Sequence, residues 1–159
     1  MSFPVIPQNL SISAMRSSGY RDSAHALAEL IDNSIQSGQE VGGRTDVEVI
    51  CVDEASEGVR RRLSRIAVVD NAEGMDPELL RKALQFGNGS RLDPKKHTGI
   101  GKFGMGLPNS SISQCKRVDV WSWRKGIVYH CYLDVREIQQ GSMQEVPLPT
   151  VSAIPATWL

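Results

Sequence analysis

The first pattern that could do chemistry pairs a carboxylate with a carboxamide, Glu29 with Asn33, in the run AELIDNS of residues 28–34. Side chains four residues apart lie one above the other on a helix face. A carboxylate can orient or deprotonate a water molecule, and an amide oxygen can ligate a hard cation such as Mg²⁺. A solvated polar stripe on an amphipathic helix explains the same spacing without chemistry, and taken alone this simpler interpretation is favoured.

The second pattern is Asp70, Gly74 and Met75 in the run VVDNAEGM of residues 68–75. An aspartate after a buried apolar strand can accept a hydrogen bond from an exocyclic amine such as that of adenine. Gly74 would let the backbone approach a base closely, and Met75 could pack against its ring. An ordinary strand-to-helix turn, with aspartate as a turn former, explains the pattern equally well.

The third pattern is the run HTGIGKFGMG of residues 97–106, directly before a predicted helix. Amides freed by Gly101, Gly104 and Gly106 could close around phosphate oxygens, and Lys102 adds a point charge. A flexible linker is an equal alternative. The run lacks the P-loop pattern, and it follows a helix and a long basic loop rather than a first strand, as a Rossmann fingerprint would.

A helix must carry the first pattern. Asp22 or Ser23 is a suitable N-cap, and the periodicity predicts a helix to about Gln36, after which glycines 38, 42 and 43 interrupt the chain. The residues expected to form its buried apolar face are Ala24, Leu27, Ala28, Ile31 and Ile35.

Further elements are expected on both sides of this helix. Residues 1–21 suggest an extended lead and a short helix, and the proline-containing tail from Gln139 is not expected to be regular throughout. Between them the sequence predicts a strand at 45–52 and a buried central strand at 66–69. A helix that begins at Asp76-Pro77 and ends at Gly87 follows, and then a helix from 107 or 108 to 115. Two strands at 118–123 and 127–135 are expected around a hairpin turn at 124–126.

Composition narrows the class of protein. The chain has 159 residues, which suggests one domain, and 18 basic residues balance 18 acidic ones. This balance gives no support for a nucleic-acid surface, so such contacts would need domains outside this chain. Three widely spaced cysteines indicate no disulfide framework. No secretion signal and no apolar run near the ~20 residues of a membrane helix are found, so we expect a cytoplasmic protein, or a nuclear one in a eukaryote.

The order and spacing of the three patterns are far more specific than any one of them. Over about residues 22–125 the chain resembles the GHKL superfamily of gyrase-type topoisomerases, ninety-kilodalton heat-shock chaperones, histidine kinases and MutL-type repair proteins. The runs at residues 28–34 and 100–106 are most similar to those of MORC-type and chaperone-type ATPases. The resemblance implies an α/β two-layer sandwich, the Bergerat fold. In that fold a mixed, mostly antiparallel sheet is covered on one face by helices, and ATP lies between the helices and a lid.

The resemblance also implies residue roles. Glu29 would be the general base for hydrolysis, Asn33 would hold Mg²⁺, and Asp70 would bind the adenine amine, with Gly74 and Met75 lining the base pocket. Residues 87–100 would form the ATP lid. The remaining residues implied to contact the nucleotide are Gly99, Ile100, Gly101, Lys102, Phe103, Gly104, Met105 and Gly106.

Three departures from the family pattern affect what is expected. Ala72 replaces the first glycine of D-x-G-x-G, a small change that leaves adenine binding expected. No match to the family's last Gly-Thr motif is found after residue 125, and no following domain supplies a phosphate-contacting lysine. We therefore expect a chain cut before the last strand of the domain. It should bind ATP or ADP itself, and turnover is expected of the intact protein.

The leading expectation for function is an ATP-driven conformational or dimerisation switch of a larger protein, in which residues 1–21 help to close an ATP-dependent homodimer. A non-catalytic nucleotide-sensing interaction module is one alternative. A histidine kinase catalytic domain is another, but no dimerisation helix with a phosphoacceptor histidine is found. The sequence does not specify the process that such a switch drives.

Overall fold

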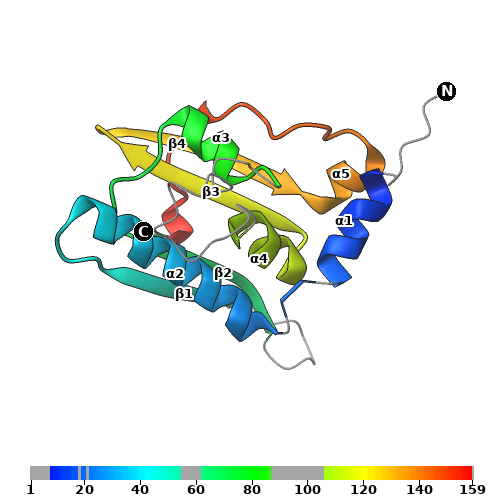
Figure 1. Ribbon diagram of the computed structural model, residues 1–159, viewed down its shortest axis with the longest axis horizontal. Coiled ribbons are helices and arrows are strands. Elements are labelled where there is room, and N and C mark those ends of the chain that lie inside the picture. The colour runs from blue at the N-terminus through cyan, green and yellow to red at the C-terminus, as the bar shows by residue number, and fades with distance from the viewer. Residues whose placement is uncertain (1–7, 18, 21, 55–61, 87–105, 159) are drawn as a thin grey trace, which may run out of the picture.

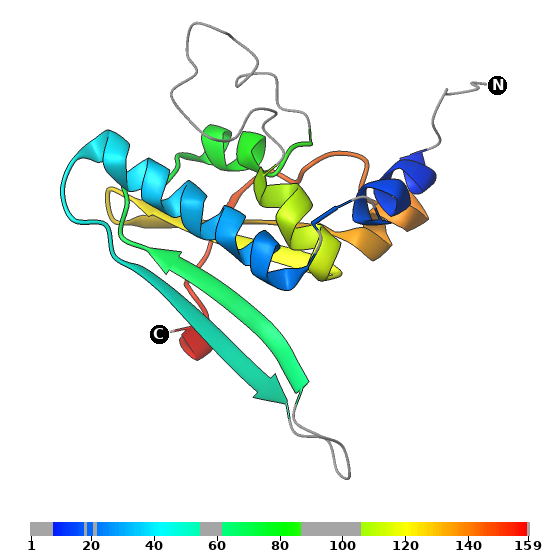
Figure 2. The same ribbon diagram turned by 60° about the horizontal axis from the view of Figure 1, so that its bottom comes forward.

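The computed structural model has helices and strands in two layers (Figure 1), and it describes residues 8–17, 19–20, 22–54, 62–86 and 106–158. Helices α2, α3 and α4 lie on one side of the strands (Figure 2). The predicted α/β two-layer sandwich is thus confirmed. In chain order the elements are α1 (Gln8–Ser17), α2 (Ser23–Val41), β1 (Val47–Glu54), β2 (Arg62–Asp70), α3 (Pro77–Ala83), α4 (Gly106–Gln114), β3 (Arg117–Arg124), β4 (Ile127–Asp134), α5 (Val135–Gln140), β5 (Thr150–Val151) and the 3₁₀ helix η2 (Ala156–Trp158).

The strands form two antiparallel sheets within the described residues, where one mixed sheet was expected. One sheet pairs β1 with β2, and the other has the order β3-β4-β5. The β1–β2 hairpin extends away from the helical layer (Figure 2). Ile66 is therefore 43% exposed, and only the last four residues of β2 are half-buried. The prediction of a buried central strand at 66–69 was wrong in both length and burial.

Helix α2 begins after the predicted N-cap Asp22 and ends at Val41, beyond the predicted end at about Gln36. Asp22 accepts a hydrogen bond from the His25 amide at 2.9 Å, which satisfies a free donor of the first turn. The helix continues through Gly38 because that glycine is buried against Thr45, whose side chain occupies the space of a Cβ. It ends at Val41, before Gly42 with φ of 74°.

The buried face of α2 is made of small residues. Ala26 and Ser34 are 3% and 7% exposed, and Gly38 is also buried. The expected apolar face was wrong at three positions, because Ala24, Ala28 and Ile35 are exposed, while Leu27 and Ile31 are half-buried. Helix α2 packs against α4, and small side chains let two helices approach closely. This packing, rather than hydrophobic periodicity, decides which face is buried.

The core joins the helices to the β3–β4–β5 sheet. Leu80 of α3 and Leu84 after it are fully buried against β4 and the segment that follows α5. A second cluster joins α1, α4 and the start of α5. The members of the first cluster are Leu80, Leu84, Cys131, Leu133 and Met143, and those of the second are Ile12, Ile112 and Val135.

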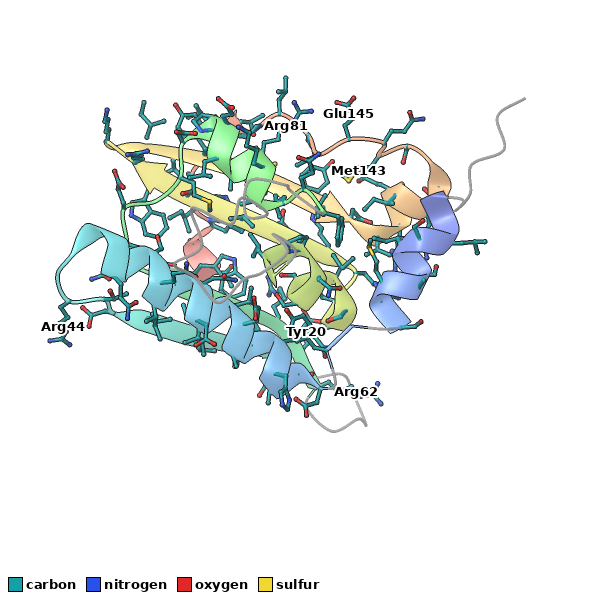
Figure 3. The ribbon with its side chains drawn as sticks, viewed as in Figure 1. Tyr20, Arg44, Arg62, Arg81, Met143 and Glu145 are labelled. Atoms are coloured by element: carbon teal, nitrogen blue, oxygen red, sulfur yellow. The ribbon has the colours of Figure 1, made fainter. Side chains whose placement is uncertain are left out.

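The chain after β4 is more ordered than its sequence suggests. Helix α5 was not predicted; its N-cap Asp134 accepts hydrogen bonds from the amides of Arg136 and Glu137 at 2.8 and 3.3 Å. Arg81 of α3 then holds the following segment, donating to the Val146 carbonyl at 2.7 Å and pairing with Glu145 at 3.0 Å (Figure 3). A short strand at 150–151 then pairs with β4.

Three other predictions were confirmed. Asp76 caps α3, accepting from the Leu79 amide at 2.8 Å, with Pro77 as the first helical residue. Helix α4 begins and ends within a residue or two of its predicted bounds. Lys125 and Gly126 have φ of 52° and 78°, the left-handed values of a two-residue hairpin turn between β3 and β4.

Candidate functional site

The first and third sequence patterns meet where α2 packs against the start of α4. Glu29 and Asn33 are both half-buried there. A Cβ on Gly106 would overlap the Glu29 carboxylate and lie 3.3 Å from the Asn33 amide nitrogen, so a larger residue here would displace the Glu29 side chain. The other residues of the third pattern, Gly99, Ile100, Gly101, Lys102, Phe103, Gly104 and Met105, and the expected lid at 87–100, lie outside the described residues.

Glu29 and Asn33 carry polar groups without partners in the part of the chain that the structure describes. Within the described residues neither side chain makes a hydrogen bond or an ion pair. Burial, and then the negative charge of Glu29, raises the pKa of the Tyr20 hydroxyl. Gly19 packs against Ser113 of α4. The residues just before α2, Gly19 and Tyr20, therefore lie beside the last turn of α4 (Figure 3).

The second pattern is tied to the first by a hydrogen bond. The Ser34 hydroxyl donates to one carboxylate oxygen of Asp70 at 2.9 Å, and the Ala72 amide donates to the other at 3.0 Å. Ser34 directly follows Asn33 on α2. Sequence reasoning did not give Ser34 a role, although a small polar residue beside Asn33, in a run otherwise interpreted as apolar and acidic, was a usable signal.

The turn after Asp70 is fixed by β3. Gly74 has φ of 76°, and a Cβ there would overlap the Trp123 carbonyl. The Met75 amide donates to the hydroxyl of Ser122 at 2.6 Å, and Ser122 is 4% exposed. Gly74 is thus required by both its backbone conformation and its close approach to the strand. Ser122 is a second positioning residue that the sequence did not indicate.

Two further contacts hold this turn. Asn71 accepts a hydrogen bond from the Asp46 amide at 2.8 Å and donates to the Arg44 carbonyl at 3.3 Å, which joins it to the segment after α2. On the other side Arg124 forms an ion pair with Glu73. The carboxylate of Asp70 thus ends a strand whose continuation is anchored to α2, to the segment after α2 and to β3.

These residues fit a nucleotide with a divalent cation. Asn33 offers a carboxamide and Glu29 a carboxylate, both without partners among the described residues. The absence of a side chain at Gly106 lets both of these groups lie against the start of α4. Asp70 accepts two hydrogen bonds, and a carboxylate can accept about four, so it can take a further donor. An aminopurine supplies such a donor, and a phosphate-bound Mg²⁺ takes oxygen ligands of this kind.

Comparisons with known proteins identify what the chain is similar to. The family described as "Histidine kinase-, DNA gyrase B-, and HSP90-like ATPase" matches residues 20–157. The chain is 28% identical to ATPase MORC2 of Homo sapiens over 130 residues, 80% of the chain and 12% of that protein. It is 28% identical to ATPase MORC2B of Mus musculus over 127 residues, 79% of the chain and 12% of that protein.

A plant relative is similar over a shorter stretch. The chain is 33% identical to Protein MICRORCHIDIA 3 of Arabidopsis thaliana over 90 residues, 57% of the chain and 14% of that protein. The chain thus spans only 12% to 14% of the length of these relatives. In the part that the structure describes, no helix is both long and apolar enough to cross a membrane.

Proposed function

The chain belongs to the histidine kinase-, DNA gyrase B- and HSP90-like ATPase family, and from this premise we propose that it binds ATP with Mg²⁺ and hydrolyses it slowly as the conformational or dimerisation switch of a larger protein. One observation carries the proposal. A single turn of α2 presents Glu29 and Asn33 without partners in the described part of the chain, while the next residue, Ser34, holds the Asp70 carboxylate at 2.9 Å. In this proposal helix α2 carries the phosphate end of the pocket and anchors, through Ser34, the Asp70 carboxylate at the base end.

Asp70 receives the adenine amine in this proposal. The carboxylate is already oriented by Ser34 and by the Ala72 amide, so little conformational freedom is lost on binding. Gly74 and Met75 line the base, and the turn that carries them is held by Ser122. Ala72, where the family pattern has glycine, donates through its backbone amide, a contact that does not depend on its side chain.

The phosphate end lies at the junction of α2 and α4. Asn33 ligates Mg²⁺, and Glu29 acts as general base by taking a proton from the attacking water. Gly106, together with Gly99, Ile100, Gly101, Lys102, Phe103, Gly104 and Met105 before it, contacts the phosphates. Support for this comes from the start of α4, which faces Glu29 and Asn33 without a side chain in between, and a helix N-terminus favours negative charge.

Residues 1–21 couple the nucleotide to the dimeric state in this proposal. The charge of Glu29 contributes to the raised pKa of Tyr20. We therefore propose that the segment before α2 responds to a nucleotide bound beside Glu29. Ordering of the lid at 87–100 by the phosphates would favour the closed state, because those contacts exist only there. The process driven by the switch, and any nucleic acid bound through other domains, belong to the larger protein. We propose a cytoplasmic location, or a nuclear one in a eukaryote.

Titration calorimetry with ADP and Mg²⁺ tests the binding site. Asp70→Asn should weaken ADP binding at least tenfold, because the amide has one acceptor oxygen for the Ser34 hydroxyl, the Ala72 amide and the adenine amine, which all donate. Asp53→Asn, which removes an equally charged but exposed carboxylate on β1, should leave the affinity unchanged. Equal affinities for the Asp70→Asn variant and the unaltered chain would refute the adenine contact.

Light scattering coupled to gel filtration tests the switch. A non-hydrolysable ATP analogue should raise the molar mass to that of a dimer, and Tyr20→Ala or deletion of residues 1–21 should reduce this effect. A dimer that persists after the deletion would contradict the role of the segment. Binding without hydrolysis by the intact protein would instead support the non-catalytic sensing alternative.

A further inference from the structure

A cavity of about 310 Å³ lies outside the residues of the nucleotide site. Its lining residues are Arg16, Lys116, Val135, Arg136 and Gln139. They come from the last turn of α1, the connection between α4 and β3, and helix α5, three segments that lie side by side in Figure 1. Three of the five lining side chains are cationic and none is acidic, although the chain as a whole has no net charge.

The base of this cavity belongs to the core, and its rim is exposed at Lys116, Arg136 and Gln139. Val135 is 3% exposed and packs with Ile12 and Ile112 in a cluster that joins α1, α4 and α5. The Val135 amide donates to the Lys116 carbonyl at 2.8 Å, which fixes that residue beside α5. Arg16 donates to the Cys115 carbonyl at 2.9 Å. Core packing and these hydrogen bonds thus fix the backbone of Lys116 and the side chain of Arg16, while the side chains of Lys116 and Arg136 are exposed.

No acidic residue of the described chain neutralises the three cations. None of Arg16, Lys116 and Arg136 forms an ion pair within the described residues, although Asp134 and Glu137 lie close by in the sequence. Asp134 is engaged by the amides that it caps and lies 3.9 Å from Arg117, and Glu137 accepts from the Tyr132 hydroxyl at 3.3 Å. The cavity therefore keeps a local charge that a bound anion would neutralise.

We propose that this cavity is a second binding site, separate from the nucleotide pocket, for a small phosphate-bearing molecule. Two guanidinium groups match the geometry of phosphate oxygens, and an ammonium adds a point charge. Three positive charges suit a phosphate or pyrophosphate group better than a single carboxylate. The volume is at the lower end of that of small-molecule sites, so it suits a compact ligand rather than a flat macromolecular surface. This site does not depend on the proposed ATPase function.

Amide NMR spectra of the chain, titrated with pyrophosphate at constant ionic strength, test the proposal by location. Pyrophosphate should shift the amide signals of residues 16, 116 and 136. The double variant Lys116→Gln with Arg136→Gln should weaken these shifts at least tenfold in concentration. The control Arg62→Gln with Lys125→Gln removes two exposed cations that do not line the cavity, and it should respond like the unaltered chain.

Other results overturn the proposal. Shifts confined to residues around Glu29 and Asn33 would place pyrophosphate in the nucleotide site alone. Equal responses of the unaltered chain and the Lys116/Arg136 variant would show that the cations do not bind it. A glutamate-rich peptide or a short DNA duplex that shifts these amides when pyrophosphate does not would assign the cavity to another class of ligand. ADP affinity should be unchanged in the Lys116/Arg136 variant, which separates this site from the nucleotide pocket.

Discussion

Two polar regions of this molecule use their charges in opposite ways. At the junction of α2 and α4, Glu29 and Asn33 are half-buried and have no partner among the described residues, and a glycine faces them. On the β3–β4 hairpin, by contrast, the side chains of Arg117, Asp119 and His130 satisfy one another. Asp119 accepts two hydrogen bonds at 2.9 Å from Arg117 and binds the His130 ring at 2.8 Å.

Stacking completes the second region. The rings of Trp121 and His130 lie 4.7 Å apart, and the Arg117 guanidinium lies 4.1 Å from the Tyr132 ring centre. A charge that its neighbours neutralise in this way supports the fold. A polar pair left without partners beside a missing side chain is available to a ligand. The comparison predicts that substitutions at the junction change nucleotide chemistry, whereas those at Arg117, Asp119 and His130 change stability alone.

The largest effect is expected for Glu29→Gln. Loss of a general base lowers the rate about 10²- to 10⁴-fold, while the uncharged amide keeps the shape of the site and therefore the binding of ATP. Single-turnover hydrolysis of labelled ATP by the intact protein measures the rate, and calorimetry measures the affinity. Unchanged hydrolysis by this variant would remove the main chemical distinction between the two regions.

The next effect is expected for Gly74→Ala. Its Cβ would overlap the Trp123 carbonyl at a φ of 76°, whereas Gly126 has a φ of 78° and open space around it. Gly126→Ala should lower the free energy of unfolding by about 1–2 kcal/mol through backbone strain alone. Gly74→Ala should lower it further and also abolish ADP binding. Urea unfolding curves measure the stability of both variants, and calorimetry measures ADP binding. Similar losses of stability in the two variants would show that the close approach to β3 is unimportant.

A smaller effect is expected for Ser34→Ala, compared with Ser110→Ala. Ser34 orients Asp70, whereas Ser110, which is 1% exposed, donates only to the Leu107 carbonyl of its own helix. Losing a hydrogen bond to a charged group is worth about 1.5–3 kcal/mol, so Ser34→Ala should weaken ADP binding about tenfold or more. Ser110→Ala should leave ADP affinity unaltered. Equal ADP affinities of the two variants would mean that Asp70 needs no anchor.

The smallest effect is expected on the hairpin. Burial would raise the pKa of the Asp119 carboxyl, but hydrogen bonds from Arg117 and His130 outweigh it and hold the pKa below the ordinary 3.8. The ionised form therefore stabilises the fold above pH 4, and this stability is lost as pH falls through the lowered pKa. Asp119→Asn should lower the free energy of unfolding at pH 6 by about 1 kcal/mol, with a weaker decline on acidification. Urea unfolding between pH 3 and 6 measures this free energy. A changed ADP affinity of Asp119→Asn would contradict the difference between the junction and the hairpin.

Local signals in the sequence predicted much of the fold. The caps at Asp22 and Asp76 and the turn at Lys125-Gly126 determine where their elements begin and end, because a cap or a left-handed turn depends on few neighbours. The three sequence patterns could also be identified, and Gly106 lies where the third was expected to approach the first. The roles of the site residues stay predictions.

Tertiary packing decides the features that were missed. Helix α2 buries Ser34 and Gly38 rather than Ile35, because close contact with α4 and Thr45 favours small side chains over hydrophobic ones. Helix α5 is short, and its residues show no clear period, so its stability comes from Val135 in the core. The anchoring roles of Ser34 and Ser122 depend on partners 36 and 47 residues away, and no local pattern encodes such distances.

The most direct test is a crystal structure of the chain with ADP and Mg²⁺. The account predicts one purine nucleotide whose exocyclic amine donates to Asp70, directly or through a water molecule. It also predicts a cation that Asn33 ligates and phosphates that face Gly106. A nucleotide bound elsewhere, or bound here with Asp70 and Asn33 both out of contact, would contradict it.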